Sequence, residues 1–121
     1  ELLFQSHSDG GTDMNDTLKS LYSVVLDRKN NPQEGSYTCY LFDKGLDKIL
    51  KKVGEECAET IIAAKNGVQA DTVGEISDLI YHLTVMMAAQ GIPMEAVMEE
   101  LDRRSRKIGN LKQMHISDHE T

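Results

Sequence analysis

The sequence predicts an all-α protein, a bundle of four to five helices that is completed by homodimerisation. Apolar residues recur at the three- and four-residue spacing of amphipathic helices through most of the chain. Aromatic residues make up only 5% of it and Trp is absent, so the core must be aliphatic, which favours helices over an aromatic-rich β-sandwich. About ninety residues in amphipathic helices can hardly bury all of their apolar faces alone, which predicts the second copy.

The first predicted helix begins at Thr17, a residue type common at N-caps, and runs to about Arg28. Its apolar positions follow helical spacing: Leu18, Leu21, Tyr22, Val25 and Leu26. The Asn-Asn-Pro sequence at 30–32 ends it. Residues 33–38 are polar and turn-like, and we expect a loop there.

The second predicted helix is capped at about Asp43 and ends at Asn66, where Gly67 can adopt the left-handed conformation of a C-cap. At 100° per residue one stripe is apolar and is the expected core face. It consists of Leu46, Ile49, Leu50, Val53, Cys57, Ile61 and Ala64.

The third predicted helix starts at Asp71 or Thr72 and ends before the Gly-Ile-Pro sequence at 91–93. Its expected core stripe consists of Ile76, Leu79, Ile80, Leu83, Met86 and Met87. The fourth helix runs from Met94 through Leu101, and basic residues near its end complement the helix dipole. These are Arg103, Arg104, Arg106 and Lys107.

The helical pattern predicts one domain over residues 14–108. Residues 1–13 are polar and glycine-rich toward their end, and we expect a disordered segment, either a tag remnant or an interdomain linker. Residues 109–121 are expected to form a flexible tail.

Charge and cysteine usage restrict the partners and the compartment. Twenty acidic residues against thirteen basic residues give a net charge of −7, which disfavours nucleic acid. No apolar run is long enough to span a membrane, and no leader is recognised, so no membrane partner is expected. Cys39 and Cys57 are isolated thiols, which indicates a reducing compartment, and we expect a cytoplasmic protein.

Acidic residues border both predicted core stripes. Glu55, Glu56 and Glu59 border the second helix, and Glu75 and Asp78 border the third. If the two helices pack antiparallel, four of these carboxylates converge in one groove: Glu56, Glu59, Glu75 and Asp78. A set of oxygen ligands is typical of Mg²⁺, with Mn²⁺ as the alternative. The competing interpretation is that these acids are simply solvated helix faces.

Lysines and one histidine accompany the acids. Lys48 and Lys52 lie about one turn before them, where they can hold phosphate oxygens or pair with the acids at i+4. His82 lies one turn past Asp78, and we expect it to pack beside the site or to orient a group there rather than to ligate a metal directly.

These residues carry a family resemblance. Glu55-Glu56-x-x-Glu59 followed by Glu75-x-x-Asp78 resembles the signature of the all-α, MazG-like nucleoside triphosphate pyrophosphohydrolases. Further motifs resemble those of the phosphoribosyl-ATP pyrophosphatase family over about residues 18–104. They are Ser36-Tyr37-Thr38, the stretch from Gly45 to Glu56 with Lys48 and Lys52, and Glu75-x-x-Asp78-Leu79-x-Tyr81-His82.

The resemblance implies a helical homodimer that hydrolyses a small nucleotide, phosphoribosyl-ATP, to phosphoribosyl-AMP and pyrophosphate with Mg²⁺, the second step of histidine biosynthesis. It implies metal ligation by the four converging carboxylates and phosphate binding by Lys48 and Lys52. Glu55 or Glu56 would accept the proton of the attacking water, and both remain open. The family also implies fusion to an upstream phosphoribosyl-AMP cyclohydrolase domain as one arrangement.

Two other functions remain alternatives at this point. An enzyme that clears non-standard nucleotides would share the metal site and differ around residues 36–38. A non-catalytic dimerisation module would need no acidic groove and would bind no divalent cation.

Overall fold

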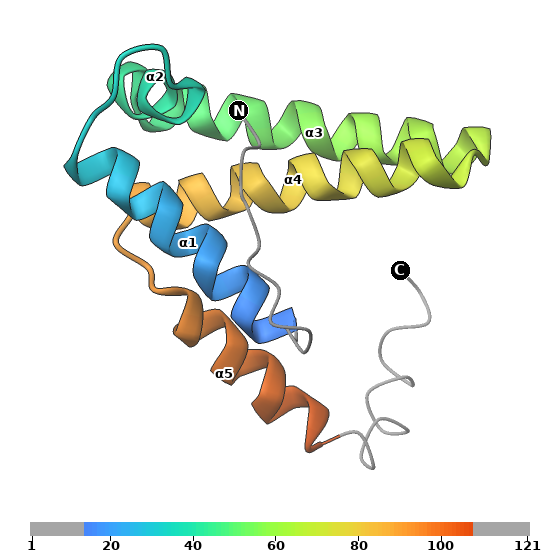
Figure 1. Ribbon diagram of the computed structural model, residues 1–121. Helices are drawn as coiled ribbons and strands as arrows, with labels where there is room; N and C mark the ends of the chain where they lie inside the picture. The colour runs from blue at the N-terminus through green and yellow to red at the C-terminus, as the bar shows by residue number, and fades with distance from the viewer. Residues whose placement is uncertain (1–13, 108–121) are drawn as a thin grey trace.

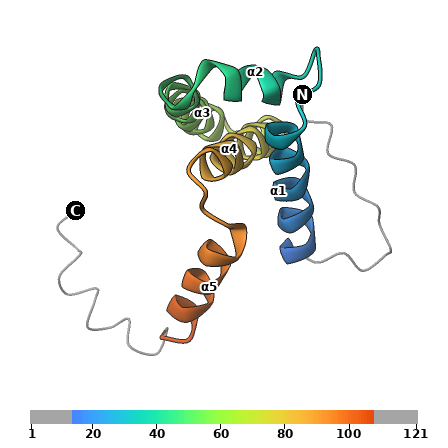
Figure 2. The ribbon, with the colours of Figure 1, turned by 90° about the vertical axis from the view of Figure 1, so that its left-hand side faces the viewer.

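The computed structural model describes residues 14–107, which form five helices and, over that range, no strand. In chain order they are α1 (Met14–Asn30), α2 (Tyr37–Lys44), α3 (Leu46–Asn66), α4 (Gln69–Ala89) and α5 (Met94–Ser105). The all-α prediction is confirmed. The long helices α3 and α4 lie side by side as an antiparallel hairpin, and α1 and α2 pack at one end of it (Figures 1 and 2).

The segment around α2 corrects one expectation. The predicted loop is present over 33–36 but ends earlier than expected, because a separate helix begins at Tyr37. The predicted helix start near Asp43 is wrong, since Asp43 lies inside α2 and α3 begins at Leu46. The Ser36 side chain caps it by accepting a hydrogen bond of 3.1 Å from the backbone N–H of Cys39. Gly45, with φ 98°, then separates α2 from α3 in a conformation that favours glycine.

Two of the other helices, α1 and α4, begin earlier than predicted. α1 begins three residues before Thr17. α4 begins at Gln69, because the backbone turns directly after the left-handed Gly67 (φ 83°) without using Asp71 as a cap. The start of α5 at Met94 and its basic C-terminal turn are confirmed.

The core lies where α1 and α2 meet the α3–α4 hairpin. It contains Val25, Leu41, Ile49, Tyr81, Val85 and Ala88. Two long-range hydrogen bonds connect α1 to the end of α4: Lys29 Nζ donates to the Ala88 carbonyl at 3.0 Å, and the Tyr22 hydroxyl donates to the Ile92 carbonyl at 2.9 Å. Beyond this core, the hairpin end at the α3–α4 turn projects away from the other helices (Figure 1).

The predicted core stripes of the two long helices are mostly exposed in the single chain, which corrects the second expectation. Of the thirteen stripe residues only Ile49 and Met87 are buried. Ile61 is 69% exposed and Ile76 is 42% exposed. The buried residues of α3 are Ile49, Glu56 and Ala63, and those of α4 include His82 and Val85. Periodicity identified apolar faces correctly, but it could not tell whether the fold of one chain covers them.

None of the helices within residues 14–107 is long and apolar enough to cross a lipid bilayer.

Candidate metal centre

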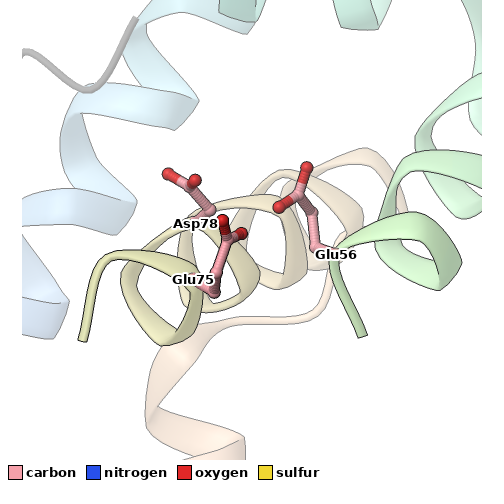
Figure 3. Close-up of side chains that lie close together, drawn as sticks. All are labelled: Glu56, Glu75 and Asp78. Carbon is pink, nitrogen blue, oxygen red and sulfur yellow. The ribbon is translucent and has the colours of Figure 1, made fainter. Parts of the chain in front are cut away.

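Three carboxylates gather where α3 and α4 pack against each other. Glu56 projects from α3, and Glu75 and Asp78 project from α4 (Figure 3). Each offers an oxygen, and the three oxygens lie within 4.8 Å of one another. The antiparallel hairpin brings them together, because the i, i+3 pair on α4 faces the middle of α3.

Thr60 contacts the backbone of both helices at this level. Its hydroxyl lies 2.7 Å from the Glu56 carbonyl oxygen and 3.3 Å from the Glu75 carbonyl oxygen. The contact across the helix pair holds the backbones of two of the three acidic residues close together.

Two oxygens of this acidic group, formed by Glu56, Glu75 and Asp78, are left without a partner in the described part of the chain. Oε1 of Glu56 and Oε1 of Glu75 are buried and have no hydrogen-bond partner among residues 14–107. Burial, followed by repulsion from Glu59, raises the pKa of both carboxyls. Buried oxygens without partners are costly in a folded protein, and a bound cation would satisfy them. The donor set therefore fits a divalent metal that takes oxygen ligands.

Glu59, the fourth predicted ligand, lies at the rim of this group. It is exposed and is not one of the three mutually close carboxylates. It lines an open pocket of about 440 Å³ together with Glu75 and Asp78. Glu59 therefore faces the same space from α3, one turn further along the helix than Glu56.

Lys52 pairs with both candidate bases, Glu55 and Glu56. Its Nζ lies 3.4 Å from Oε1 of Glu55 and 3.6 Å from Oε2 of Glu56. Burial opposes its charge, but Tyr37 and the two glutamates outweigh that effect, so the pKa of Lys52 is raised and it remains a cation. Glu55 is exposed and lies outside the three-carboxylate group.

Lys48 lies beside an aromatic ring. Its Nζ is 6.0 Å from the ring centroid of Tyr40, and Lys44 approaches the same ring at 5.7 Å. The two lysines therefore have different partners, since Lys52 pairs with the glutamates and Lys48 approaches Tyr40.

His82 is buried beside Asp78 but is not among the grouped ligands. Its Nδ1 lies 2.8 Å from the Asp78 carbonyl oxygen, which can only accept, so Nδ1 carries the proton. Nε2 then accepts from the Tyr37 hydroxyl at 3.0 Å. Burial lowers the pKa of His82, which favours the neutral ring that this arrangement requires.

Tyr37 and Thr60 were not assigned a role from the sequence. Thr60 falls between two acidic motifs, and nothing in its spacing marks a contact to the next helix. Tyr37 lies in the Ser-Tyr-Thr motif, but its contact with His82 spans 45 residues and depends on the unpredicted helix α2. Tyr81, which the helical projection places away from the site, is buried and bonds the Thr38 hydroxyl.

Comparison with known proteins agrees with this arrangement. A sequence model described as phosphoribosyl-ATP pyrophosphohydrolase matches residues 18–105. The chain is 54% identical over 101 residues to a phosphoribosyl-ATP pyrophosphatase of Clostridium acetobutylicum, covering 84% of this chain and 92% of the relative. A phosphoribosyl-ATP pyrophosphatase of Pelotomaculum thermopropionicum is 54% identical over 92 residues, or 76% of this chain and 94% of that protein.

A longer relative matches only in part. The histidine biosynthesis bifunctional protein HisIE of Thermoanaerobacter pseudethanolicus is 61% identical over 83 residues, which are 69% of this chain and 38% of that protein. The match over residues 18–105 and the near full-length relatives lead to one conclusion: this chain belongs to the phosphoribosyl-ATP pyrophosphohydrolase family of hydrolases.

Proposed function

We propose that this protein hydrolyses phosphoribosyl-ATP to phosphoribosyl-AMP and pyrophosphate, the second step of histidine biosynthesis, with Mg²⁺ as cofactor and Mn²⁺ as a substitute. The observation that carries the proposal is the group of Glu56, Glu75 and Asp78, with two buried oxygens that lack a partner among the described residues. The names of the full-length relatives support the substrate.

Glu56, Glu75 and Asp78 would hold the metal, and Glu59 would join them from the rim of the pocket. When bound, the ion would neutralise charge on the phosphate oxygens of the substrate. Lys52 is the nearest cation to this group and would take a phosphate oxygen that the metal leaves uncovered. Lys48 would contact a phosphate further from the acids.

Glu55 is the general base in this proposal. Water attacks a phosphorus atom of the link between the α- and β-phosphates and gives its proton to Glu55. The P–O bond from that phosphorus to the bridging oxygen breaks, which releases pyrophosphate. Glu55 lies next to the metal group without belonging to it, so its oxygens stay available to accept the proton. A phosphate that engages Lys52 would also release Glu55 from its ion pair.

Product analysis tests the reaction. We expect pyrophosphate and phosphoribosyl-AMP from phosphoribosyl-ATP, and much slower turnover of common nucleoside triphosphates. Orthophosphate as product, or a preference for common triphosphates, would contradict the proposal. A calorimetric titration that finds no saturable Mg²⁺ or Mn²⁺ binding would instead support a non-catalytic module.

Two isosteric variants separate the base from the ligands. Glu55→Gln is expected to lower kcat by about 10²- to 10⁴-fold and to keep calorimetric Mg²⁺ binding. Glu56→Gln is expected to lower both kcat and the affinity for Mg²⁺. If Glu56→Gln keeps Mg²⁺ affinity while Glu55→Gln loses it, the two roles must be exchanged.

The homodimer is also part of the proposal. The large apolar side chains that the single chain leaves exposed on α3 and α4 include Leu50, Ile61, Val73, Ile76 and Ile80. They run along both helices of the hairpin, and exposed apolar area of this extent is typical of interfaces. A second copy of the same chain would cover them.

The cellular setting completes the proposal. Cys39 and Cys57 are both free thiols, as is usual in a reducing cytoplasm. The bifunctional relative supports fusion to an upstream phosphoribosyl-AMP cyclohydrolase domain as one context for such a chain. The net charge of −7 argues against nucleic acid as a partner.

A further inference from the structure

Two lysines converge on one exposed aromatic ring outside the metal centre. Tyr40 of α2 is 42% exposed. The ammonium groups of Lys44, from the end of α2, and Lys48, from the first turns of α3, lie 5.7 and 6.0 Å from its ring centroid. The α2–α3 break at Gly45 places both lysines beside the ring.

Within residues 14–107 no carboxylate lies within 4 Å of either ammonium group, although Asp43 and Asp47 adjoin them in sequence. Lys52, by contrast, has two carboxylate partners. A cation over an exposed ring gains only about 0.5–1 kcal/mol, and two cations beside one ring repel each other. An anion with two negative charges would neutralise both ammonium groups and bond to both.

This cationic position is connected to the metal centre by aromatic contacts. Tyr40 stacks on Tyr37 at 6.0 Å between centroids, and the Tyr37 hydroxyl bonds His82, whose ring bonds the Asp78 carbonyl. Along α3, Lys48 precedes Glu56 by eight residues, or about 12 Å. The two positions are therefore suited to separate anionic groups of one ligand rather than to neighbouring phosphates.

We propose that Tyr40, Lys44 and Lys48 form a subsite for the phosphate of the phosphoribosyl group, the anionic group that distinguishes phosphoribosyl-ATP from ATP. The inference rests on the proposed function and deepens it. The acidic group and Lys52 take the triphosphate, and the subsite takes the phosphate at the other end of the same molecule. The subsite would favour phosphoribosyl-ATP over common nucleotides, because common nucleotides have no second anionic group that could bind to these lysines.

Binding of the product-side nucleotides tests the subsite without turnover. Calorimetry on the full chain with AMP and with phosphoribosyl-AMP gives the ratio of their dissociation constants. We expect the wild type to bind phosphoribosyl-AMP at least about tenfold more tightly than AMP. The double variant Lys44→Gln/Lys48→Gln is expected to bring this ratio close to one.

Matched variants test whether a changed ratio could come simply from the loss of positive charge or from unfolding. Lys51→Gln removes an exposed lysine of α3 that has no ion pair within the described range, and the ratio is expected to stay at the wild-type value. Tyr40→Leu should lower the ratio and Tyr40→Phe should restore it, since the ring face and not the hydroxyl meets the lysines. Circular dichroism confirms that each variant is folded.

The outcomes separate the two proposals. If the wild type releases no pyrophosphate from phosphoribosyl-ATP, the proposed function itself fails. If it does, and the double variant keeps the wild-type ratio, only the subsite is overturned. A wild-type ratio near one, or an equal loss of both nucleotides in Tyr40→Leu, also overturns the subsite.

Discussion

The two ends of the α3–α4 hairpin differ in how their apolar side chains are covered. At the end where α1 and α2 pack, Leu41 and Val85 are fully buried in the core of a single chain. Toward the α3–α4 turn, Ile61 and Val73 are more than half exposed (Figure 1). One end is therefore stabilised within a single chain, whereas the other leaves apolar side chains that the proposed second copy would cover.

The candidate metal centre lies on the hairpin between these two regions. Its acids sit on the inner faces of α3 and α4, where packing buries Glu56. Carboxylate oxygens that are buried there without a hydrogen-bond partner among the described residues lower stability, which is common at functional sites. The substitutions below test the three parts of the hairpin separately, from the largest expected effect to the smallest.

Neutralising the acidic group should have the largest effect. Glu59→Gln and Asp78→Asn keep size and helix pattern but remove the negative charge of a proposed ligand, so we expect pyrophosphate release to fall by about 10²- to 10³-fold. Thermal unfolding without metal should show an equal or higher Tm, because repulsion among the acids is relieved. Glu99→Gln in α5 is the control, and site variants as active as this control would refute the metal assignment.

Truncation in the closed end should destabilise each chain. Leu41→Ala removes a fully buried side chain and is expected to cost about 2–5 kcal/mol of unfolding free energy. Ile61→Ala near the turn removes a comparable side chain that one chain leaves exposed. Urea titrations at low protein concentration should show a large loss of unfolding free energy for Leu41→Ala and little loss for Ile61→Ala. Equal losses would mean that the two ends do not differ in the isolated chain.

Charges on the open end should change assembly rather than folding. Ile61→Lys combined with Ile76→Lys puts two charges on the exposed stripe and is expected to convert a dimer into a monomer. Sedimentation equilibrium would show the mass halved, while circular dichroism keeps its helical signal. A wild type that is monomeric at micromolar concentration would remove the homodimer from the proposal.

The smallest effect is expected far from the hairpin, on α5. Hydrogen bonds from Arg103 and Arg104 lower the pKa of Glu100 to about 2. Its folded-state pKa is below the unfolded value, so its contribution is present above about pH 4.5 and is lost as the pH falls toward 2. Glu100→Gln should lose only a small part of the acid sensitivity in pH-dependent unfolding, because all three side chains are solvent-exposed or nearly so. A large change would show that α5 contributes more to the fold than its surface position suggests.

Local sequence determined the helices and the acidic motifs. Periodicity and end signals, such as Gly67 and the start at Met94, act within a few residues and therefore predicted the long helices well. Glu75 and Asp78 share a face because they are three residues apart in a helix, and that follows from helix geometry alone. The family motifs pointed to the same acids.

Only the tertiary structure decided which surfaces are covered and which side chains meet. In the folded chain Glu56 is one of the three grouped carboxylates, whereas Glu59 lies at their rim. Lys48 lies beside the Tyr40 ring, and Tyr37 forms a hydrogen bond with His82, which is 45 residues away in the sequence. These outcomes depend on how α2 turns at Gly45 and how closely α3 and α4 pack. Spacing along one helix contains no information about the neighbour that a face will meet, because burial is a property of packed helices and not of a single one.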